Sequence, residues 1–220
     1  ADMHGDIDVA DLPKVIINYV NDYFPVYDLL DTTFQSEVVA VNEMQQAFNF
    51  EISITNPTPL TLVFLPKLTQ LEDALIFGNF NRQQQLFNLD AIVDVVEFAG
   101  VYSDQMVLTA EGVSENLQAN IALLDVHSGI MASPLAILET NLKDDSLRFR
   151  LNVLGDTLDQ RLDVRGIVYE TEKWYEGKLT EDYVLNTRPW QVSADNAIYF
   201  WDKNWYVNNL AIREGKHEVI

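Results

Sequence analysis

The sequence predicts a mainly β protein, a β-sandwich preceded by one amphipathic helix. From residue 46 onward, short segments alternate apolar and polar residues, as a strand with one buried face does. Residues that favour turns separate these segments. Near the N-terminus, apolar residues instead recur every three or four positions. We therefore divide the 220 residues into an acidic segment with a helical arm, 1–45, and a β-domain, 46–220.

The N-terminal helix is predicted from the spacing of its apolar residues. Asp11 is placed to cap it, Pro13 falls in its first turn, where no amide donor is needed, and Pro25 ends it. The apolar face comprises Leu12, Val15, Ile16, Tyr19, Val20, Tyr23 and Phe24. Because this face is strongly apolar, we expect it to pack against a large surface.

The segment 2–11 carries carboxylates at short intervals beside His4. Hard oxygen ligands of this kind bind Ca²⁺ or Mg²⁺, but the twelve-residue pattern of an EF-hand is absent. We interpret the segment as a solvated acidic terminus that ends in a helix cap, and a divalent site at Asp2–Asp11 stays the alternative.

The first predicted strand alternates Phe48, Phe50, Ile52 and Ile54 with polar residues, and Pro57 and Pro59 end it. A second apolar strand follows at Leu60–Leu65. The further predicted strands are Ala74–Phe77, Ala91–Phe98, Gln105–Ala110, Leu135–Thr140, Leu147–Leu154, Leu162–Tyr169, Ala197–Trp201 and Trp205–Ile212.

One segment interrupts the strand pattern. Leu117, Ile121 and Leu124 follow Ser114 at helical spacing, and Gly129 closes the segment, so we predict a helix of about three turns there. Two hairpins are also predicted. One joins Leu147–Leu154 to Leu162–Tyr169, and the other spans Phe200–Tyr206.

The composition excludes several classes of function. With 34 acidic and 14 basic residues, the net charge of −20 disfavours nucleic acids and anionic membranes, whose binding needs Lys and Arg. The absence of Cys excludes disulfides, zinc-thiolate sites and thiol nucleophiles. No apolar run reaches the roughly 18 residues of a transmembrane helix.

Catalytic motifs are absent as well. His4, His127 and His217 form no metal-ligand spacing, and no GxSxG or phosphate-cradling glycine loop occurs. We therefore predict a protein that is not an enzyme and needs no cofactor, although paired carboxylates of a hydrolase are not recognisable from sequence.

Two clusters stand out against this composition. Four of the basic residues, Arg148, Arg150, Arg161 and Arg165, fall in one predicted hairpin. They either form ion pairs with Asp145, Asp159 and Asp163 or dock on an acidic face of another copy. An aromatic cluster near the C-terminus suits a core, a subunit interface or a sugar-stacking platform. It comprises Trp174, Tyr175, Trp190, Tyr199, Trp201, Trp205 and Tyr206.

The β-rich part resembles the jelly-roll capsid proteins of icosahedral, membrane-containing bacteriophages. The segment from Phe48 to Pro66, an alternating strand, an Asn-Pro turn and an apolar strand, is similar to their opening strands. The segments Ala74–Asn79, Glu115–Leu124, Ala136–Asn141, Asp182–Val184 and Asn196–Ile212 are similar to later elements. The resemblance covers residues 48–212 and implies a jelly-roll β-sandwich; the length suits one roll better than two.

The leading hypothesis is therefore a structural virion protein, a capsid subunit that assembles with copies of itself into a trimer or larger shell. Other virion proteins are further candidate partners. We expect subunit contacts at Tyr19, Tyr23, Phe24, Arg148, Arg150, Trp201 and Trp205. Assembly would take place in the host cytoplasm. The alternative is a secreted or cell-surface module that binds carbohydrate through the aromatic cluster.

Overall fold

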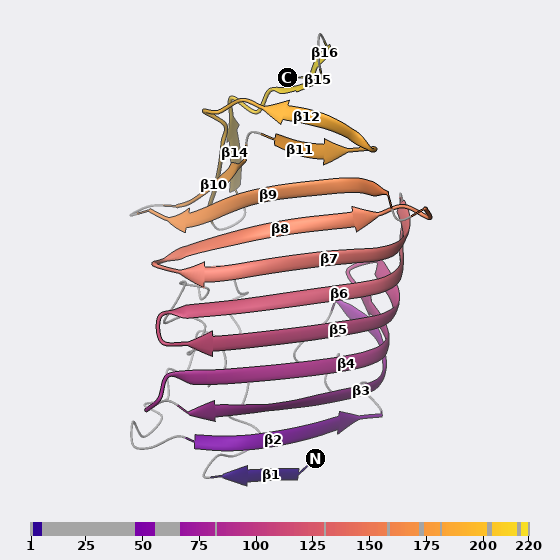
Figure 1. Ribbon diagram of the computed structural model, residues 1–220, viewed down its shortest axis with the longest axis vertical. Helices are drawn as coiled ribbons and strands as arrows, with labels where there is room; N and C mark the ends of the chain where they lie inside the picture. Colours follow the sequence, from indigo (N-terminus) through magenta and orange to yellow (C-terminus); the bar gives the residue numbers. More distant parts are fainter. Residues whose placement is uncertain are drawn as a thin grey trace.

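A computed structural model describes residues 2–5, 47–55, 67–81, 83–129, 131–157, 159–171, 174–180, 182–201, 204–214 and 217–219. All sixteen strands of this part belong to one antiparallel sheet, and β1 to β9 are hydrogen-bonded in chain order (Figure 1). The strands are β1 (Asp2–Gly5), β2 (Ala47–Ile54), β3 (Leu68–Asn81), β4 (Leu86–Phe98), β5 (Val101–Val113), β6 (Asn116–Ser128), β7 (Met131–Lys143), β8 (Ser146–Leu154), β9 (Gln160–Glu170), β10 (Tyr175–Leu179), β11 (Asp182–Leu185), β12 (Arg188–Val192), β13 (Ala197–Trp201), β14 (Asn204–Asn208), β15 (Ile212–Glu214) and β16 (His217–Val219).

The middle of the sheet is built from nearly identical units. Each of β4, β5, β6 and β7 has 13 residues, and two residues join each strand to the next. Ala99 with Gly100 and Asp144 with Asp145 have positive φ at both positions, which is the type I′ conformation whose twist suits an antiparallel hairpin. Short turns of this kind force consecutive strands to be neighbours, and a meander results.

One face of the sheet, which we call the apolar face, carries aligned rows of apolar side chains. Residues paired across an antiparallel ladder lie on the same face, so each row runs across the strands. One row, from β2 to β9, comprises Phe48, Phe80, Phe87, Gly112, Leu117, Leu142, Leu147 and Val168. A parallel row comprises Ile52, Ile76, Ala91, Leu108, Ile121, Leu138, Leu151 and Val164. The residues that alternate with these rows along each strand point to the opposite face. Beside the two rows, that face carries mainly amide and charged side chains.

The long strands bend near one end, and Figure 1 shows them curving there. Val93 and Val96 of β4 are both buried in one cluster with Leu68 and Ala74. Residues three apart in a flat strand point to opposite faces, so the strand must turn between them. At this level Asp73 and Asp125 have positive φ.

Two buried serines satisfy backbone groups at the bend. The Ser103 hydroxyl donates to the Leu124 carbonyl at 2.6 Å, and the Ser133 hydroxyl donates to the Leu154 carbonyl at 2.6 Å. The two serines are 30 residues apart, which is the length of two 13-residue strands with their two-residue turns. The bend is therefore a repeated feature of the sheet, with its polar groups paired internally.

The sheet divides after β9. Strand β10 pairs with the Gly166–Glu170 part of β9, whereas β11 pairs with Leu162 and Asp163. Asn196 lies at the division and is 1 % exposed. Its side-chain amide accepts from the Leu179 amide at 2.8 Å and donates to the Leu179 carbonyl at 3.0 Å, so that it replaces a strand residue as hydrogen-bond partner.

The predicted mainly β class and both predicted hairpins are confirmed. The jelly-roll arrangement is not what the described strands show, because a jelly roll requires strands that cross between two sheets, whereas β1 to β9 pair in chain order. The N-terminal helix and the strand Leu60–Leu65 lie outside the described residues. Strand β1, which belongs to the predicted 1–45 segment, pairs with β2.

The predicted helix at Glu115–Leu124 is wrong, because Glu115 lies in a turn and the rest of this segment belongs to β6. Leu117 and Ile121 are four residues apart, a spacing that places side chains on one side of either a helix or a strand. In the structure they share the apolar face with Ala119 and Leu123. Pairing with β5 and β7 makes this segment a strand. The spacing of its apolar residues does not predict that pairing.

The close packing around Gly166 leaves no room for a side chain at this position. A Cβ added to Gly166 would lie 2.6 Å from Phe149 Cζ and 2.7 Å from the Lys178 carbonyl oxygen. We expect Gly166→Ala to lower the free energy of unfolding, measured by urea denaturation, by about 1–3 kcal/mol. Gly177→Ala is the matched control, since its nearest atom is 3.6 Å away. An equal loss of stability in both variants would contradict the packing described.

Candidate functional site

The apolar face is the most extensive feature of the described surface. Its two sides are buried: a cluster of Phe48, Phe80, Phe87, Leu117 and Leu142 extends along one side, and two smaller clusters line the bend at the other. Between these sides, the row that contains Leu108, Ile121, Leu138 and Leu151 is only partly buried. The middle of the apolar face therefore keeps contact with solvent along successive strands.

Polar side chains on the apolar face hydrogen-bond to backbone carbonyls of the sheet. Ser103 and Ser133 do so at the bend, and the Thr140 hydroxyl donates to the Ala119 carbonyl at 3.1 Å. These side chains already have partners, so the middle of this face offers few groups with which a sugar or a peptide would form hydrogen bonds. It suits a ligand that contributes hydrocarbon.

The opposite face carries a polar groove of about 440 Å³ that crosses β3 to β6. It is lined by Asn79, Asn88, Asp90, Thr109, Ala110, Glu111, Gln118 and Asn120. Asn88 donates to Asn79 at 3.1 Å across the strands. Phe77, 40 % exposed, pairs in register with Asp90 beside this groove. Farther toward the bend, the same face becomes apolar at Leu75 and Ile92.

An ion-pair cluster lies on the opposite face between β8 and β9. Asp163 has 8 % side-chain exposure and accepts from Arg150 Nε at 2.9 Å and from Arg150 Nη2 at 3.1 Å. Arg165 Nη2 donates to the same carboxylate at 3.1 Å. Hydrogen bonds from Arg150, more than those from Arg165, hold the pKa of Asp163 below its usual value. The ion-pair interpretation of this hairpin is thus confirmed for Arg150 and Arg165.

The aromatic cluster contains two groups of rings, one on each face of the β10–β13–β14 branch, and only the group on the apolar face is stacked. On the apolar face, Tyr175 stacks on Phe200 with ring centroids 5.2 Å apart, and Phe200 stacks on Trp205 at 5.0 Å. On the other face, Trp174 contacts Tyr199 and Trp201, and Tyr199 contacts Tyr206. Burial falls along this branch, from Tyr175 at 4 % exposed to Trp205 at 69 %.

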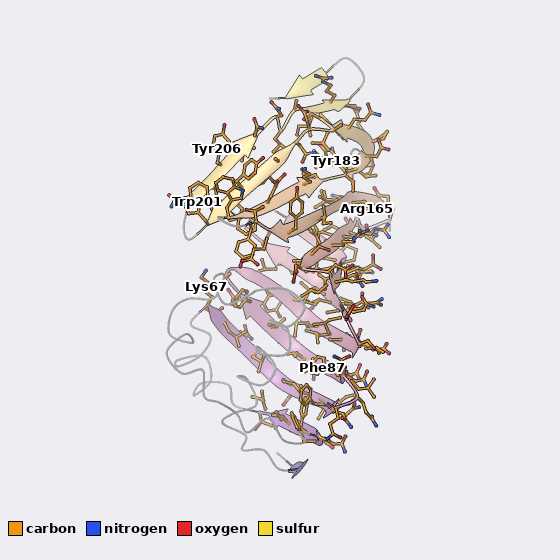
Figure 2. The ribbon with its side chains drawn as sticks, turned by 90° about the vertical axis from the view of Figure 1, so that its left-hand side faces the viewer. Lys67, Phe87, Arg165, Tyr183, Trp201 and Tyr206 are labelled. Atoms are coloured by element: carbon orange, nitrogen blue, oxygen red, sulfur yellow. The ribbon has the colours of Figure 1, made fainter. Side chains whose placement is uncertain are left out.

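The structure separates the expected contact residues rather than bringing them together. Trp201 and Trp205 lie on the β13–β14 hairpin, and Figure 2 shows Trp201 on the side of the molecule away from Arg165. Arg148 is exposed on the opposite face and Arg150 is engaged with Asp163. Tyr19, Tyr23 and Phe24 lie outside the described residues. Their roles in subunit contacts stay predictions.

Two features could not be found from the sequence: the continuity of the apolar face across the strands, and two buried polar atoms on β11 and β12. The Tyr183 hydroxyl and Trp190 Nε1 are buried without a hydrogen-bond partner, and the two residues pair in register between β11 and β12. Burial raises the pKa of Tyr183. No local sequence signal identifies such atoms, because their burial depends on the division of the sheet.

Within the described residues, no group of three or more His, Asp or Glu side chains is arranged to hold a metal ion. The acidic positions Asp6, Asp8 and Asp11 lie outside these residues, so a divalent site there stays a prediction. The described part of the chain also has no helix with the length and hydropathy needed to cross a membrane.

Comparison of the chain with protein-family models, with curated proteins and with solved structures finds no match.

The Asp163 cluster predicts a pH-dependent contribution to stability. The folded-state pKa of Asp163 is lowered, so its carboxylate stabilises the fold above its unfolded pKa of about 3.9. This contribution is lost as the pH falls through the lower folded pKa. We expect Asp163→Asn to cost about 1–2 kcal/mol near pH 7, less than a fully buried pair because both Arg side chains reach solvent.

Urea denaturation over a pH series is the measurement. The difference between the wild type and Asp163→Asn should vanish in strong acid, whereas the exposed turn variant Glu115→Gln should match the wild type near neutral pH. A stability difference that does not change with pH would contradict the role of the Asp163 carboxylate.

Proposed function

We propose that the protein holds an elongated apolar ligand, the acyl chain of a neutral or zwitterionic lipid, along its apolar face. The observation that carries this proposal is the row from Ile52 on β2 to Val164 on β9, which is uninterrupted by polar residues and partly exposed at every position except the buried Ala91. A sheet normally buries such a face against a second layer. In the described part of the chain, every strand belongs to the same sheet.

The dimensions of the row support an acyl chain. Neighbouring strands are about 4.8 Å apart, so the eight strands from β2 to β9 span roughly 34 Å. One lipid leaflet contributes about 15 Å to the hydrocarbon core of a bilayer, half of its roughly 30 Å thickness. The row is thus long enough for an extended acyl chain that lies across the strands.

The chemistry of the face and the charge of the chain narrow the ligand class. Ser103, Ser133 and Thr140 already donate to backbone carbonyls, which favours hydrocarbon over sugar or peptide. The net charge of −20 disfavours a ligand with an anionic headgroup. A neutral or zwitterionic headgroup meets both conditions.

Binding of a neutral apolar fluorophore tests this proposal. We expect N-phenylnaphthylamine to gain fluorescence with the protein and to be displaced by a long-chain monoacylglycerol. Leu138→Gln, which puts an amide on the apolar face, should weaken binding more than about fivefold. Ile137→Gln is the matched control, because Ile137 directly precedes Leu138 on β7 and points to the opposite face.

Circular dichroism would verify that both variants fold. The proposal is wrong if the fluorophore does not bind, or if Ile137→Gln weakens binding as much as Leu138→Gln. Displacement by soluble oligosaccharides instead of monoacylglycerol would favour the carbohydrate-binding alternative, for which the polar groove beside Phe77 is the better placed surface.

A second proposal is self-assembly, with the capsid subunit as its most specific form. It is supported by large aromatic side chains exposed at the end of the sheet, including Trp201 and Trp205, and by exposed Arg148 on a strongly acidic chain. Because Arg150 is engaged by Asp163, Arg148 is the residue better placed to meet an acidic neighbour.

Mass measurement by light scattering tests the assembly proposal. If Arg148 docks on an acidic face of another copy, Arg148→Glu should lower the population of trimers and larger species several-fold and leave the urea midpoint unchanged. A wild-type chain that stays monomeric at high concentration would overturn this proposal without bearing on lipid binding.

A further inference from the structure

Strand β14 is an edge of the sheet that the described strands form. It pairs with β13 and with no other described strand, so the side of its backbone that faces away from β13 has no partner among the described strands. Its three central side chains are strongly exposed: Trp205 at 69 %, Tyr206 at 58 % and Val207 at 51 %. Figure 2 shows Tyr206 at the outer margin of the molecule.

The side chains of β14 lack the protective features that natural edge strands usually carry. Protective features are Lys or other charged residues, Pro, and bulges that twist the edge away. The strand Asn-Trp-Tyr-Val-Asn has no charge and no Pro, in a chain whose net charge is −20. Two copies can therefore approach each other along β14 without placing like charges opposite one another.

The sequence of β14 is nearly symmetric about Tyr206. In an antiparallel pair centred on this residue, Tyr206 would lie opposite Tyr206 of the second copy, and Trp205 opposite Val207. Asn204 would lie opposite Asn208. We propose that β14 pairs with β14 of a second copy of this chain in this register, across a two-fold axis, and makes one sheet continuous through both copies.

The register follows from the two faces of the strand. Trp205 and Val207 lie on the apolar face, where they pair with Phe200 and Ile198, and Tyr206 lies on the other face beside Tyr199. A pairing centred on a residue keeps each face continuous from one copy to the other, whereas a shift by one residue places the apolar face of one copy beside the other face of its neighbour.

The flanking asparagines have a precedent in this sheet. Asn88 donates to Asn79 at 3.1 Å, and these residues are register partners on neighbouring strands. Asn141 likewise donates to Asn116 at 2.6 Å on adjacent strands. Asn204 and Asn208 of two copies would repeat this amide pairing at both ends of the interface.

The inference does not depend on what the apolar face binds, and it names a contact that the assembly proposal leaves open. A two-fold contact of identical surfaces is closed, so it produces dimers rather than an open array. With five residues from each copy the interface is small, and association weaker than that of a standard-sized interface is expected. Self-association should therefore be measured by sedimentation up to high protein concentration.

Charge exchange at Tyr206 tests the register in the full chain. Tyr206→Glu and Tyr206→Lys should each be more than about tenfold weaker in self-association than the wild type, because like charges would face each other. An equimolar mixture of the two should form mixed dimers that neither variant forms alone. If the wild type stays monomeric, or if the mixture does not associate, the proposal is overturned.

Disulfide formation provides an independent test, because the chain contains no Cys. Directly opposed residues of an antiparallel pair have Cα atoms about 4.5–5.5 Å apart, within the range that a disulfide spans. Tyr206→Cys should therefore cross-link to dimers under mild oxidation at least tenfold faster than Asn120→Cys, an exposed position far from the edge.

Val207→Cys gives the register control, since Val207 would face Trp205 and not itself. It should cross-link slowly alone and rapidly when mixed with Trp205→Cys. Circular dichroism and urea midpoints establish that each variant folds. Equal rates for Tyr206→Cys and Asn120→Cys would show that β14 makes no such contact.

Discussion

From β1 to β9, each strand is hydrogen-bonded to its successor, and the rest of the structure depends on this pairing. From β4 to β8, turns of two residues force each strand to pair with the strand before it and the strand after it. Because paired residues share a face, this pairing converts the alternation within each strand into rows that cross the whole sheet. The apolar face, the polar groove and the open edges all follow from it.

The same pairing explains why polar chemistry is distributed as it is. On the apolar face, the hydroxyls of Ser103 and Ser133 donate hydrogen bonds to backbone carbonyls at the bend. On the opposite face, Asp163 is compensated by Arg150 and Arg165, which makes the basic hairpin mainly a structural element. Among the described residues, the apolar row and the edge at β14 are left without such charge compensation. We assign a hydrocarbon chain to the first and a second copy of β14 to the second.

Much of the secondary structure could be predicted from local patterns. The alternation at Phe48–Ile54 and the hairpins around Gly155 and at Phe200–Tyr206 are confirmed. Local patterns failed at Glu115–Leu124, where a spacing of four fits both a helix and a strand. They also contain no information about which strands become neighbours. The resemblance in strand order therefore suggested a jelly roll, whereas the described strands form a meander.

The sequence by itself determined that the protein is mainly β, that Arg148 and Arg150 lie on one face of a strand, and that Cys chemistry is absent. Only the tertiary structure decided that Asp163 neutralises Arg150, that Asn196 bonds to both Leu179 and Ser193, and that Trp205 lies on an edge strand of the described sheet. The physical reason is that alternation is a property of one strand, whereas register, the division of the sheet and exposure depend on pairing between strands that are distant in sequence.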